Sequence, residues 1–492
     1  MLAKENVFTT EKFLIEHGKS RAISFHMPGH KGSEFYVRNG HGEFLKHIMS
    51  CDITEIRGAD NLFHANGILE RTAEAYSNMY HVSKSYLLVN GTSGGILAAI
   101  LGSVSRGGKL IMARNCHKSV YNALRMGNIK AEYVYPSIID DINISGDVRV
   151  SGIEAAMKDA PDAEAVILPS PNYYGVCSNI KAIADVVHRE NKILIVDQAH
   201  GAHLKMMENT GSQPMSAETS GADIVINSTH KTLASFTQTA ILNVNSERVN
   251  LHNIEDKLQM VESSSPSYLL MGSLDINRLI IEEQGEKLFE GWQHNIDWFY
   301  GEARQIPGIE ILDMGELHDK TKINIDASDL GLTGIQLEEK LLEQGIYIEL
   351  STGNMVMCMT GIGTTYEHLN KLLIALRRIS HNQREYINSN GSLNNRELRI
   401  NRDEPVSTWN KKRDTWEVIG ERELVNLGNA TGCIAACNIV PYPPGVPLIC
   451  QGEIIGQDDA EYLKYLNSCG NDILGLEKGN KVYVIKENKT VK

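Results

Sequence analysis

Cysteine is scarce in this sequence. Eight cysteines are spread over 492 residues, which is too few for a scaffold held together by disulfides. The pair Cys433 and Cys437 lacks the second cysteine pair or the nearby histidines that a zinc site requires. The composition therefore disfavours both a disulfide-rich protein and a cysteine-ligated zinc protein.

Long apolar segments are also missing. Residues 1–20 contain no apolar stretch of the kind that a signal peptide has. The uncharged stretch 85–105 is nearly long enough to span a bilayer, but its centre, NGTSGG (residues 90–95), is too polar and flexible for that role. We therefore expect a soluble, cytoplasmic protein with no membrane segment.

Positive charge is in deficit. Lys and Arg number 48 against 61 Asp and Glu, so the formal net charge is −13. An acidic surface repels phosphate backbones, which makes a nucleic-acid partner unexpected, and it favours encounter with a cationic small molecule. With 42% hydrophobic and 22% charged residues, the chain is typical of a globular protein. Its length suggests about three domains, and one large α/β domain with appendages fits as well.

Short apolar runs alternate with helical patterns from residue 85 to about residue 244. The stretches between the runs space apolar residues three and four apart, as in IKAIADVVHRE at 180–190. This alternation predicts a doubly wound α/β domain (85–270) with a mainly parallel sheet, whose ligands bind beyond the carboxyl ends of the strands. The predicted strands are 86–89, 109–113, 131–135, 163–168, 192–196, 223–226 and 239–244.

The pattern changes after residue 244. A long helix over about 274–305 predicts a second, smaller α+β domain at 271–380, and the polar segment 381–415 indicates a linker. The last domain, 416–492, contains PYPPGVP (441–447), whose prolines favour an extended backbone. In the smaller domain we expect strands near 309–312, 322–325, 346–349 and 355–359, and helices at 334–344 and 366–379.

The segment NGTSGG lies between a predicted strand and a predicted helix. Its glycines let the backbone close around an anion, its hydroxyls can donate hydrogen bonds, and a helix N-terminus adds partial positive charge. The segment therefore favours a phosphate cradle, although an ordinary capped β–α turn has the same composition. It is not a Walker loop, since the one Gly-Lys-Ser, at 18–20, has Phe13 where that motif needs glycine.

Three further polar segments follow predicted strands: NCHKS (115–119), DQAHGAH (197–203) and STHKT (228–232). A carboxylate such as Asp197 at the end of a buried apolar strand is costly unless it meets a cation or a donor. Lys231 is equally unusual as a structural residue in such a place. Zinc ligation by Asp197, His200 and His203 is an alternative, but the order HExxH and a clear helix are absent.

One ligand satisfies all four segments: pyridoxal 5′-phosphate. Asp197 can face its basic ring nitrogen, His117 can cover its aromatic face, and Lys231 can condense with its aldehyde. The 34 residues from Asp197 to Lys231 leave room for one crossover and one strand. Its phosphate can be bound by Thr92, Ser93, Ser228 and His230.

In these segments the sequence resembles the Orn/Lys/Arg decarboxylase family, pyridoxal-phosphate enzymes with the aspartate-aminotransferase-like fold (fold type I). The resemblance covers nearly the whole chain, and in length the chain is similar to the short bacterial form, best known as arginine decarboxylase. Besides the four segments above, the resemblance rests on SFHMPGHKG (24–32), DITE (52–55) and residues 441–453. It implies a large α/β domain with a mainly parallel sheet and smaller α+β C-terminal domains.

The resemblance also implies roles for individual residues. It implies that Lys231 is the Schiff-base lysine, that Asp197 is the partner of the pyridine nitrogen and that His117 stacks on the ring. Glu453 matches a carboxylate that meets the distal cation of the substrate; alternatively it is a solvated glutamate after a turn. The implied phosphate ligands are Thr92, Ser93, Ser228 and His230, and Ala199 and His200 line the other face of the ring.

The implied assembly is a homodimer with active sites at the subunit interface, to which segment 1–84 contributes. The implied reaction is α-decarboxylation of a basic L-amino acid, with arginine giving agmatine and carbon dioxide, as in polyamine biosynthesis. Either Lys231 or His117 could return the proton to Cα. The alternatives are lysine, ornithine or a modified basic amino acid as substrate, another pyridoxal-phosphate reaction such as transamination, a catalytically silent regulatory homologue, and metal-dependent hydrolysis.

The sequence departs from the family pattern in the part that faces the substrate. Gly432 is followed by Cys433 where the family commonly has arginine, and Cys437 stands at a commonly acidic position. Arg57 replaces a frequent proline, and residues 450–451 are also atypical. These departures leave the cofactor residues intact, so the identity of the substrate is less constrained than the chemistry.

Overall fold

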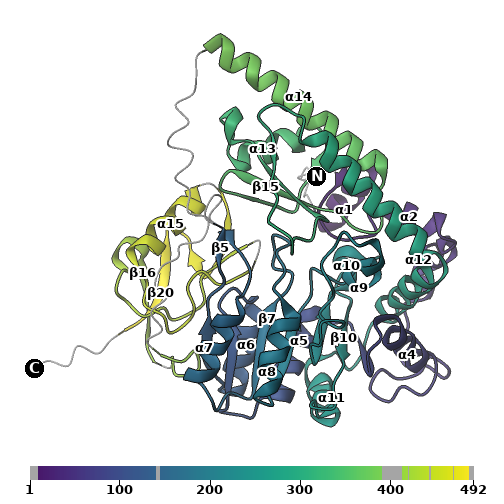
Figure 1. Ribbon diagram of the computed structural model, residues 1–492, viewed down its shortest axis with the longest axis vertical. Helices are drawn as coiled ribbons and strands as arrows, with labels where there is room; N and C mark the ends of the chain where they lie inside the picture. Colours follow the sequence, from purple (N-terminus) through teal and green to yellow (C-terminus); the bar gives the residue numbers. More distant parts are fainter. Residues whose placement is uncertain are drawn as a thin grey trace, which may run out of the picture.

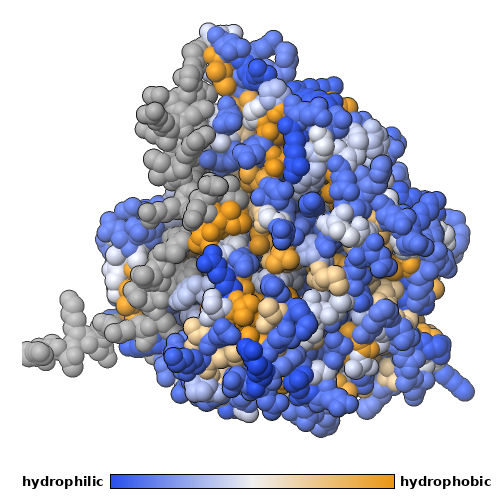
Figure 2. All heavy atoms as spheres, in the orientation of Figure 1, coloured by the Kyte–Doolittle hydropathy of each residue, from blue (hydrophilic) through white to orange (hydrophobic). Residues whose placement is uncertain are grey.

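The structure is a computed structural model that describes residues 9–139, 144–390, 413–418, 420–442, 445–468 and 470–486 (Figure 1). No helix in these ranges is both long and apolar enough to cross a membrane. Figure 2 shows a face that is mostly hydrophilic, with hydrophobic side chains near its centre.

A seven-stranded sheet forms the centre of the larger α/β region. Four neighbouring pairs, from β9 through β8, β7 and β3 to β4, run parallel, whereas β10 runs antiparallel to both β9 and β2. This confirms the predicted mainly parallel sheet. In spatial order the strands are β2 (Lys84–Leu88), β10 (Ala240–Val244), β9 (Ile224–Asn227), β8 (Ile193–Asp197), β7 (Ala165–Pro169), β3 (Lys109–Ala113) and β4 (Lys130–Val134).

The strands begin and end within two residues of the predicted positions. Strands β8 and β9 are buried over almost their whole length, which explains why their sequences are apolar without alternation. Strands of the sheet contact α5 (Gly91–Ser103), α7 (Val150–Asp159) and α8 (Ile180–Arg189), and beside α5 pack α6 (Lys118–Gly127) and α11 (Leu251–Val261) (Figure 1).

Helix α12 (Tyr268–Ala303) leads from the large sheet to a smaller antiparallel one. That sheet has the strand order β11 (Glu310–Ile311), β12 (Lys322–Asp326), β15 (Met355–Met359) and β14 (Leu350–Thr352), and it packs with α13 (Gly334–Leu342) and α14 (Tyr366–Asn390). Strand β13 (Ile346–Tyr347) instead pairs in parallel with β1 (Ile23–Ser24). The N-terminal segment is therefore joined to this smaller domain by main-chain hydrogen bonds.

Helix α14 corrects one expectation. It continues through Asn390, so the beginning of the segment predicted as a linker (381–415) is helical. The reason is that polarity alone does not end a helix: residues 381–390 contain good helix formers, and the first glycine comes at Gly391. Residues 391–412 of the predicted linker lie outside the described residues.

The C-terminal region has its own small core. Strand β17, which contains Pro441 and Tyr442, pairs antiparallel with β18, so this part of the proline segment is extended as predicted, while Pro443 and Pro444 lie outside the described residues. The elements are β16 (Arg422–Asn426), β17 (Val440–Tyr442), α15 (Gln457–Ser468), β18 (Asp472–Leu474), β19 (Leu476–Glu477) and β20 (Lys481–Ile485).

The N-terminal segment consists mainly of short helices, of which only α4 is followed directly by the large sheet. Phe25, Phe35 and Tyr36 are buried in a core shared with the smaller domain. The helices are α1 (Thr10–Lys19), α2 (Ser33–Arg38), α3 (Gly42–Lys46) and α4 (Ile68–Tyr80).

Candidate active site

Asp197 and Lys231 lie at the carboxyl ends of the neighbouring strands β8 and β9. Asp197 is the last residue of β8, and Lys231 lies in the short helix α10 (Thr229–Thr232) that follows β9. Burial raises the pKa of Asp197 against the opposing effect of the Lys231 ammonium. Burial likewise lowers the pKa of Lys231, although Asp197 and Glu349 act to raise it. The structure therefore brings the buried Asp197 and the half-buried Lys231 close enough for each charge to act on the pKa of the other.

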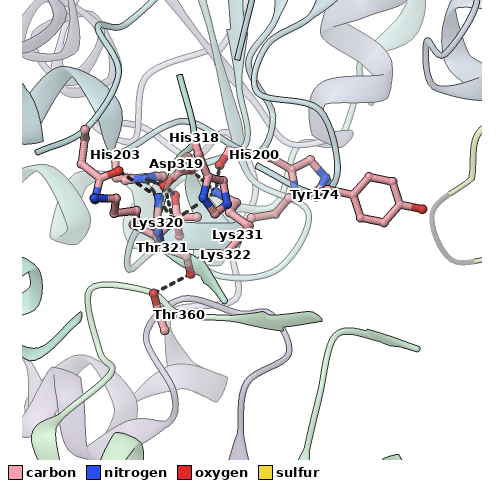
Figure 3. Close-up of polar contacts among 12 residues, drawn as sticks. Tyr174, His200, His203, Lys231, His318, Asp319, Lys320, Thr321, Lys322 and Thr360 are labelled. Carbon is pink, nitrogen blue, oxygen red and sulfur yellow. Dashed lines mark hydrogen bonds and ion pairs between the residues drawn. The ribbon is translucent and has the colours of Figure 1, made fainter. Parts of the chain in front are cut away.

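His200 contacts Lys231 directly. Nζ of Lys231 lies 2.7 Å from Nε2 of His200 (Figure 3). Burial, together with Lys231, lowers the pKa of His200 far below its usual value, so the imidazole is neutral. Its Nδ1 atom is buried without a hydrogen-bond partner among the described residues. The ring of Tyr173 packs against this imidazole at a centroid distance of 4.7 Å. The neutral imidazole of His200 can therefore accept a hydrogen bond from the amine of Lys231 and hold it in position.

His117 caps α6 and lies close enough to Lys231 to be affected by its charge. Its Nδ1 atom is 2.9 Å from the hydroxyl of Ser119 and accepts the Ser119 amide at 3.3 Å. Burial, then Lys231 and Lys118, lowers the pKa of His117 to about 3. A neutral imidazole fixed by these bonds is suited to cover an aromatic ring.

The predicted cradle forms the first turn of α5. Gly91 has φ +70°, in the left-handed region that favours glycine, and a Cβ atom at Gly95 would lie only 2.6 Å from Cδ1 of Leu88. Thr92 is half-buried and Ser93 is exposed at the helix N-terminus, where unpaired main-chain N–H groups attract anions. The geometry fits a phosphate cradle.

Glu262, which the sequence analysis missed, supports the turn before this cradle. One oxygen of its buried carboxylate accepts the amides of Val89 and Asn90, both at 3.0 Å. Burial raises the pKa of Glu262 to about 7. The carboxylate follows α11, so a helix distant in sequence fixes the backbone that leads into the cradle.

Ser228 and His230 are buried next to each other beside Lys231. The Ser228 hydroxyl is 3.0 Å from Nδ1 of His230, and the same Nδ1 is 2.9 Å from the carbonyl of Thr239. Because a carbonyl only accepts, Nδ1 carries the proton in the neutral ring, which leaves Nε2 as an acceptor. Burial lowers the pKa of His230 to about 4, so His230 would donate to a phosphate through Nε2 only after it takes up a proton.

Glu349 is a second carboxylate of the site that the sequence analysis did not select. It is 5% exposed and accepts the Tyr173 hydroxyl at 2.7 Å and the Met27 amide at 3.1 Å. Its charge acts to raise the pKa of Lys231. The signal was available, since Glu349 ends an apolar run in the same way as Asp197 does.

A buried polar network lies behind His200 (Figure 3). Nζ of Lys322 donates to the His200 carbonyl and, at 2.5 Å, to Asp319. Asp319 lies 3.2 Å from Nε2 of His203, whose Nδ1 is 3.1 Å from the hydroxyl of Thr232. These partners engage both nitrogens of His203, which disfavours the alternative in which His203 ligates zinc. The sequence analysis missed Asp319 and Lys322.

Glu453 lies in a buried ion pair with Arg114. Only 2% of Glu453 is exposed, so the alternative of a solvated surface glutamate is wrong. Its oxygens accept from Arg114 at 2.8 and 3.1 Å and from the Cys450 amide at 2.7 Å. The contact of Glu453 with a substrate cation stays a prediction.

Together these residues fit pyridoxal 5′-phosphate. The buried Asp197 carboxylate accepts only the Ala199 amide among the described residues, so it is available to a ring nitrogen. Lys231 has a lowered pKa, which favours the neutral amine that condenses with an aldehyde. The N-terminus of α5 supplies the anion site.

Comparison with known proteins agrees with this geometry. Residues 9–313 match the family model for the Orn/Lys/Arg decarboxylase major domain, and residues 404–485 match the model for the C-terminal domain. This chain belongs to the Orn/Lys/Arg decarboxylase family. The predicted family is thereby confirmed.

Among the relatives of this family member are two arginine decarboxylases of bacilli. The protein from Bacillus anthracis is 31% identical over 492 residues, covering 97% of each chain. The protein from Bacillus subtilis is 29% identical over 491 residues, covering 97% of this chain and 98% of the relative.

Solved structures of related proteins confirm the predicted fold of this family member. Lysine decarboxylase A from Pseudomonas aeruginosa superposes with a TM-score of 0.73 at 19% identity, covering 96% of this chain and 80% of that one. L-threonine transaldolase from Pseudomonas fluorescens superposes with a TM-score of 0.58 at 13% identity, covering 77% and 90%. At these identities the likeness establishes the aspartate-aminotransferase-like fold alone.

Proposed function

We propose that this protein is a pyridoxal-phosphate-dependent decarboxylase of a basic L-amino acid, and that arginine, which gives agmatine and carbon dioxide, is its substrate. The observation that carries the proposal is that the charge of the half-buried Lys231 acts on the pKa of both the buried Asp197 and the half-buried His117 at the carboxyl edge of the sheet. Membership of the Orn/Lys/Arg decarboxylase family supports the reaction type. The full-length similarity to arginine decarboxylases supports the choice of arginine.

The residues that would hold the cofactor are those that the sequence selected. Lys231 would bind it through the side-chain amine, Asp197 would keep its ring nitrogen protonated, and His117 would cover one face of the ring. Thr92, Ser93, Ser228 and His230 would bind its phosphate, and Ala199 and His200 would line the opposite face. When bound, pyridoxal phosphate supplies an electron sink for the electron pair that the departing carbon dioxide leaves behind.

Asp197 gives this site its electrostatic function. A carboxylate fixed at the end of β8 stabilises positive charge at the atom it faces, and the low polarity of its surroundings strengthens that effect. Its negative charge also opposes the effect of burial on the pKa of Lys231.

The pair Lys231 and His200 is the best-placed source of the proton that Cα must regain. Their nitrogen atoms are 2.7 Å apart, and His200 is neutral because of burial. Lys231 can therefore deliver a proton while His200 holds the resulting neutral amine in position. His117 accepts the Ser119 amide through Nδ1, so only its Nε2 atom remains for the same task.

Glu349 is our candidate for binding the cationic end of the substrate. It is a buried carboxylate whose charge acts on Lys231, and Tyr173 and the Met27 amide fix its orientation. A charged hydrogen bond to a guanidinium or ammonium group would explain a preference for basic amino acids. Glu453 already accepts three hydrogen bonds within the chain, so its role as a substrate contact is the weaker proposal.

Product analysis tests the proposed function. Purified protein with pyridoxal phosphate is incubated separately with arginine, lysine and ornithine, and the products are identified by mass spectrometry beside a Lys231→Ala sample. We expect agmatine from arginine and no amine from the variant. Cadaverine or putrescine alone would replace the substrate, and a keto acid or substantial turnover by Lys231→Ala would overturn the reaction.

We also propose that the protein acts in the cytoplasm as a homodimer whose interface includes segment 1–84. The segment carries large apolar side chains that are exposed in the single chain, among them Phe13, Leu14, Val37, Met49 and Ile56. Exposed apolar groups of this size favour burial against a partner. Sedimentation velocity measures the assembly, and a stable monomer at micromolar concentration would contradict this proposal.

A further inference from the structure

Arg114 directly follows strand β3 and is 1% exposed, although it carries a full charge. Its guanidinium uses every N–H that it has. Nε and Nη2 donate to the two oxygens of Glu453 at 3.1 and 2.8 Å. The other N–H groups donate to the Tyr121 hydroxyl and to the carbonyls of Pro447 and Leu448, at 3.1, 2.7 and 3.2 Å. Such a bidentate pair fixes distance and orientation at once.

The pair joins two parts of the chain that are 339 residues apart. Arg114 belongs to the region that carries the large sheet, whereas Glu453 and the two carbonyls belong to the C-terminal region. Glu453 is held in turn by the Cys450 amide at 2.7 Å. The ion pair with Glu453 and the hydrogen bonds from Arg114 to two main-chain carbonyls therefore hold residues 445–453 at the end of β3.

This arrangement places Gly445 against His117. The carbonyl of Gly445 accepts the amide of Lys118, the residue after His117, at 3.1 Å. Gly445 has φ +86°, and a Cβ atom there would lie 3.3 Å from both Cδ2 and Nε2 of His117. The C-terminal segment is thus one wall of the space that the His117 ring occupies, and glycine lets it approach closely.

We propose that Arg114 and Glu453 are positioning residues for the cofactor site: their ion pair holds the Gly445 segment against His117 and so fixes the imidazole that covers the cofactor ring. The inference rests on the proposed function, since it assumes that pyridoxal phosphate binds beside His117. It assigns Glu453 to the architecture of the site, in place of a contact with the substrate.

Removing either charge should loosen the segment without removing any group that touches the cofactor. An unpaired charge left in the interior either becomes hydrated or shifts its surroundings, and the first neighbour along the chain from Arg114 is the His117 segment. Substitutions at Arg114 and at Glu453 should therefore weaken the binding of the cofactor in the same way, although the two residues are far apart in the sequence.

The test compares variants for their dissociation constant for pyridoxal phosphate and for the visible circular dichroism of the bound cofactor. Arg114→Lys removes the guanidinium that contacts both oxygens of Glu453, and Glu453→Gln removes the negative charge. The matched controls are Arg106→Lys and Glu421→Gln on the exposed surface. We expect each of the two variants to weaken binding by about tenfold, and the double variant to be no weaker than the worse single one. The controls should bind as the parent does.

A second pair of variants leaves both charges in place. Gly445→Ala introduces a methyl group against His117, whereas Gly479→Ala introduces one at an exposed glycine with similar positive φ but open surroundings. Gly445→Ala should weaken binding and alter the dichroism, and Gly479→Ala should not. If the charge variants do not fold, this pair decides alone.

The inference is overturned if Glu453→Gln raises only the KM for the amino acid while the cofactor affinity and dichroism stay unchanged. It is also overturned if Gly445→Ala binds the cofactor as Gly479→Ala does. Failure of the proposed function has a different signature, because the unaltered protein would then bind no pyridoxal phosphate at all.

Discussion

Nζ of Lys231 lies 2.7 Å from Nε2 of His200, and burial lowers the pKa of both groups. Burial favours the neutral form of both groups: it favours the reactive amine of Lys231 and the neutral imidazole of His200. The same pair is 31 residues apart in the sequence and becomes adjacent only because β8 and β9 are neighbours in the sheet.

The first prediction concerns that pair. His200→Phe keeps a ring beside Tyr173 but removes the nitrogen that contacts Lys231. We expect kcat to fall roughly a hundredfold at saturating cofactor, because a positioned proton-transfer partner contributes on that order. Steady-state kinetics measures this, with the exposed His252→Phe as control. A kcat equal to that of the control would show that His200 takes no part in proton transfer.

The second prediction concerns Glu349. Glu349→Gln keeps an acceptor for Tyr173 but removes the charge offered to the substrate. The KM for arginine should rise by about tenfold or more, since a hydrogen bond to a charged group is worth roughly 1.5–3 kcal/mol, and the decrease in kcat should be smaller. Glu339→Gln, on the exposed face of α13, is the control. An unchanged KM would reject Glu349 as the substrate carboxylate.

The third prediction concerns the network behind His200. Lys322→Met leaves the buried Asp319 without its closest cation, which should destabilise the protein by about 3–5 kcal/mol. Lys320→Met, two residues away and less buried, should have little effect. Chemical denaturation of the two variants checks this, and equal stabilities would mean that the Lys322–Asp319 pair makes no net contribution.

Glu262 gives a prediction about pH. Burial raises its pKa from 4.5 to about 7 in the folded protein, so the folded state binds more protons than the unfolded state between those values. Stability is therefore lost as pH rises from about 4.5 to above 7, by at most about 3 kcal/mol. Glu262→Gln removes this loss, so its melting temperature should gain on that of the parent between pH 5 and pH 8.

The control for that experiment is Glu255→Gln, which changes a half-exposed glutamate of the preceding helix α11. Its melting temperature relative to the parent should show no such gain. If the melting temperatures of the parent and of Glu262→Gln changed equally with pH, Glu262 would not titrate in this range.

Much of the fold follows from local sequence patterns. Strands such as β3 and β8 are apolar because helices cover them, and that burial is visible in the sequence itself. Asp197, Lys231 and His117 could be selected because each polar group follows such a strand, where parallel strands direct their ends to one edge. Helix α14 was underestimated because polarity was taken as a sign of a linker.

The residues that were missed depend on partners distant in sequence. Lys322 is recognisable only beside the His200 carbonyl, 122 residues away, and Arg114 only beside Glu453. The sequence around each residue does not indicate such a pair. A lysine or arginine is therefore expected on the surface until its distant partner is known. Glu349 is different, since a carboxylate at the end of an apolar run was a signal already used for Asp197.

The most direct test of the account asks which lysine holds the cofactor. The protein loaded with pyridoxal phosphate is reduced with sodium borohydride and digested, and the peptides are mapped by mass spectrometry. The account predicts one phosphopyridoxyl group, on the peptide that contains Lys231. A label on another lysine, or none in a protein that still forms the amine product, would contradict it.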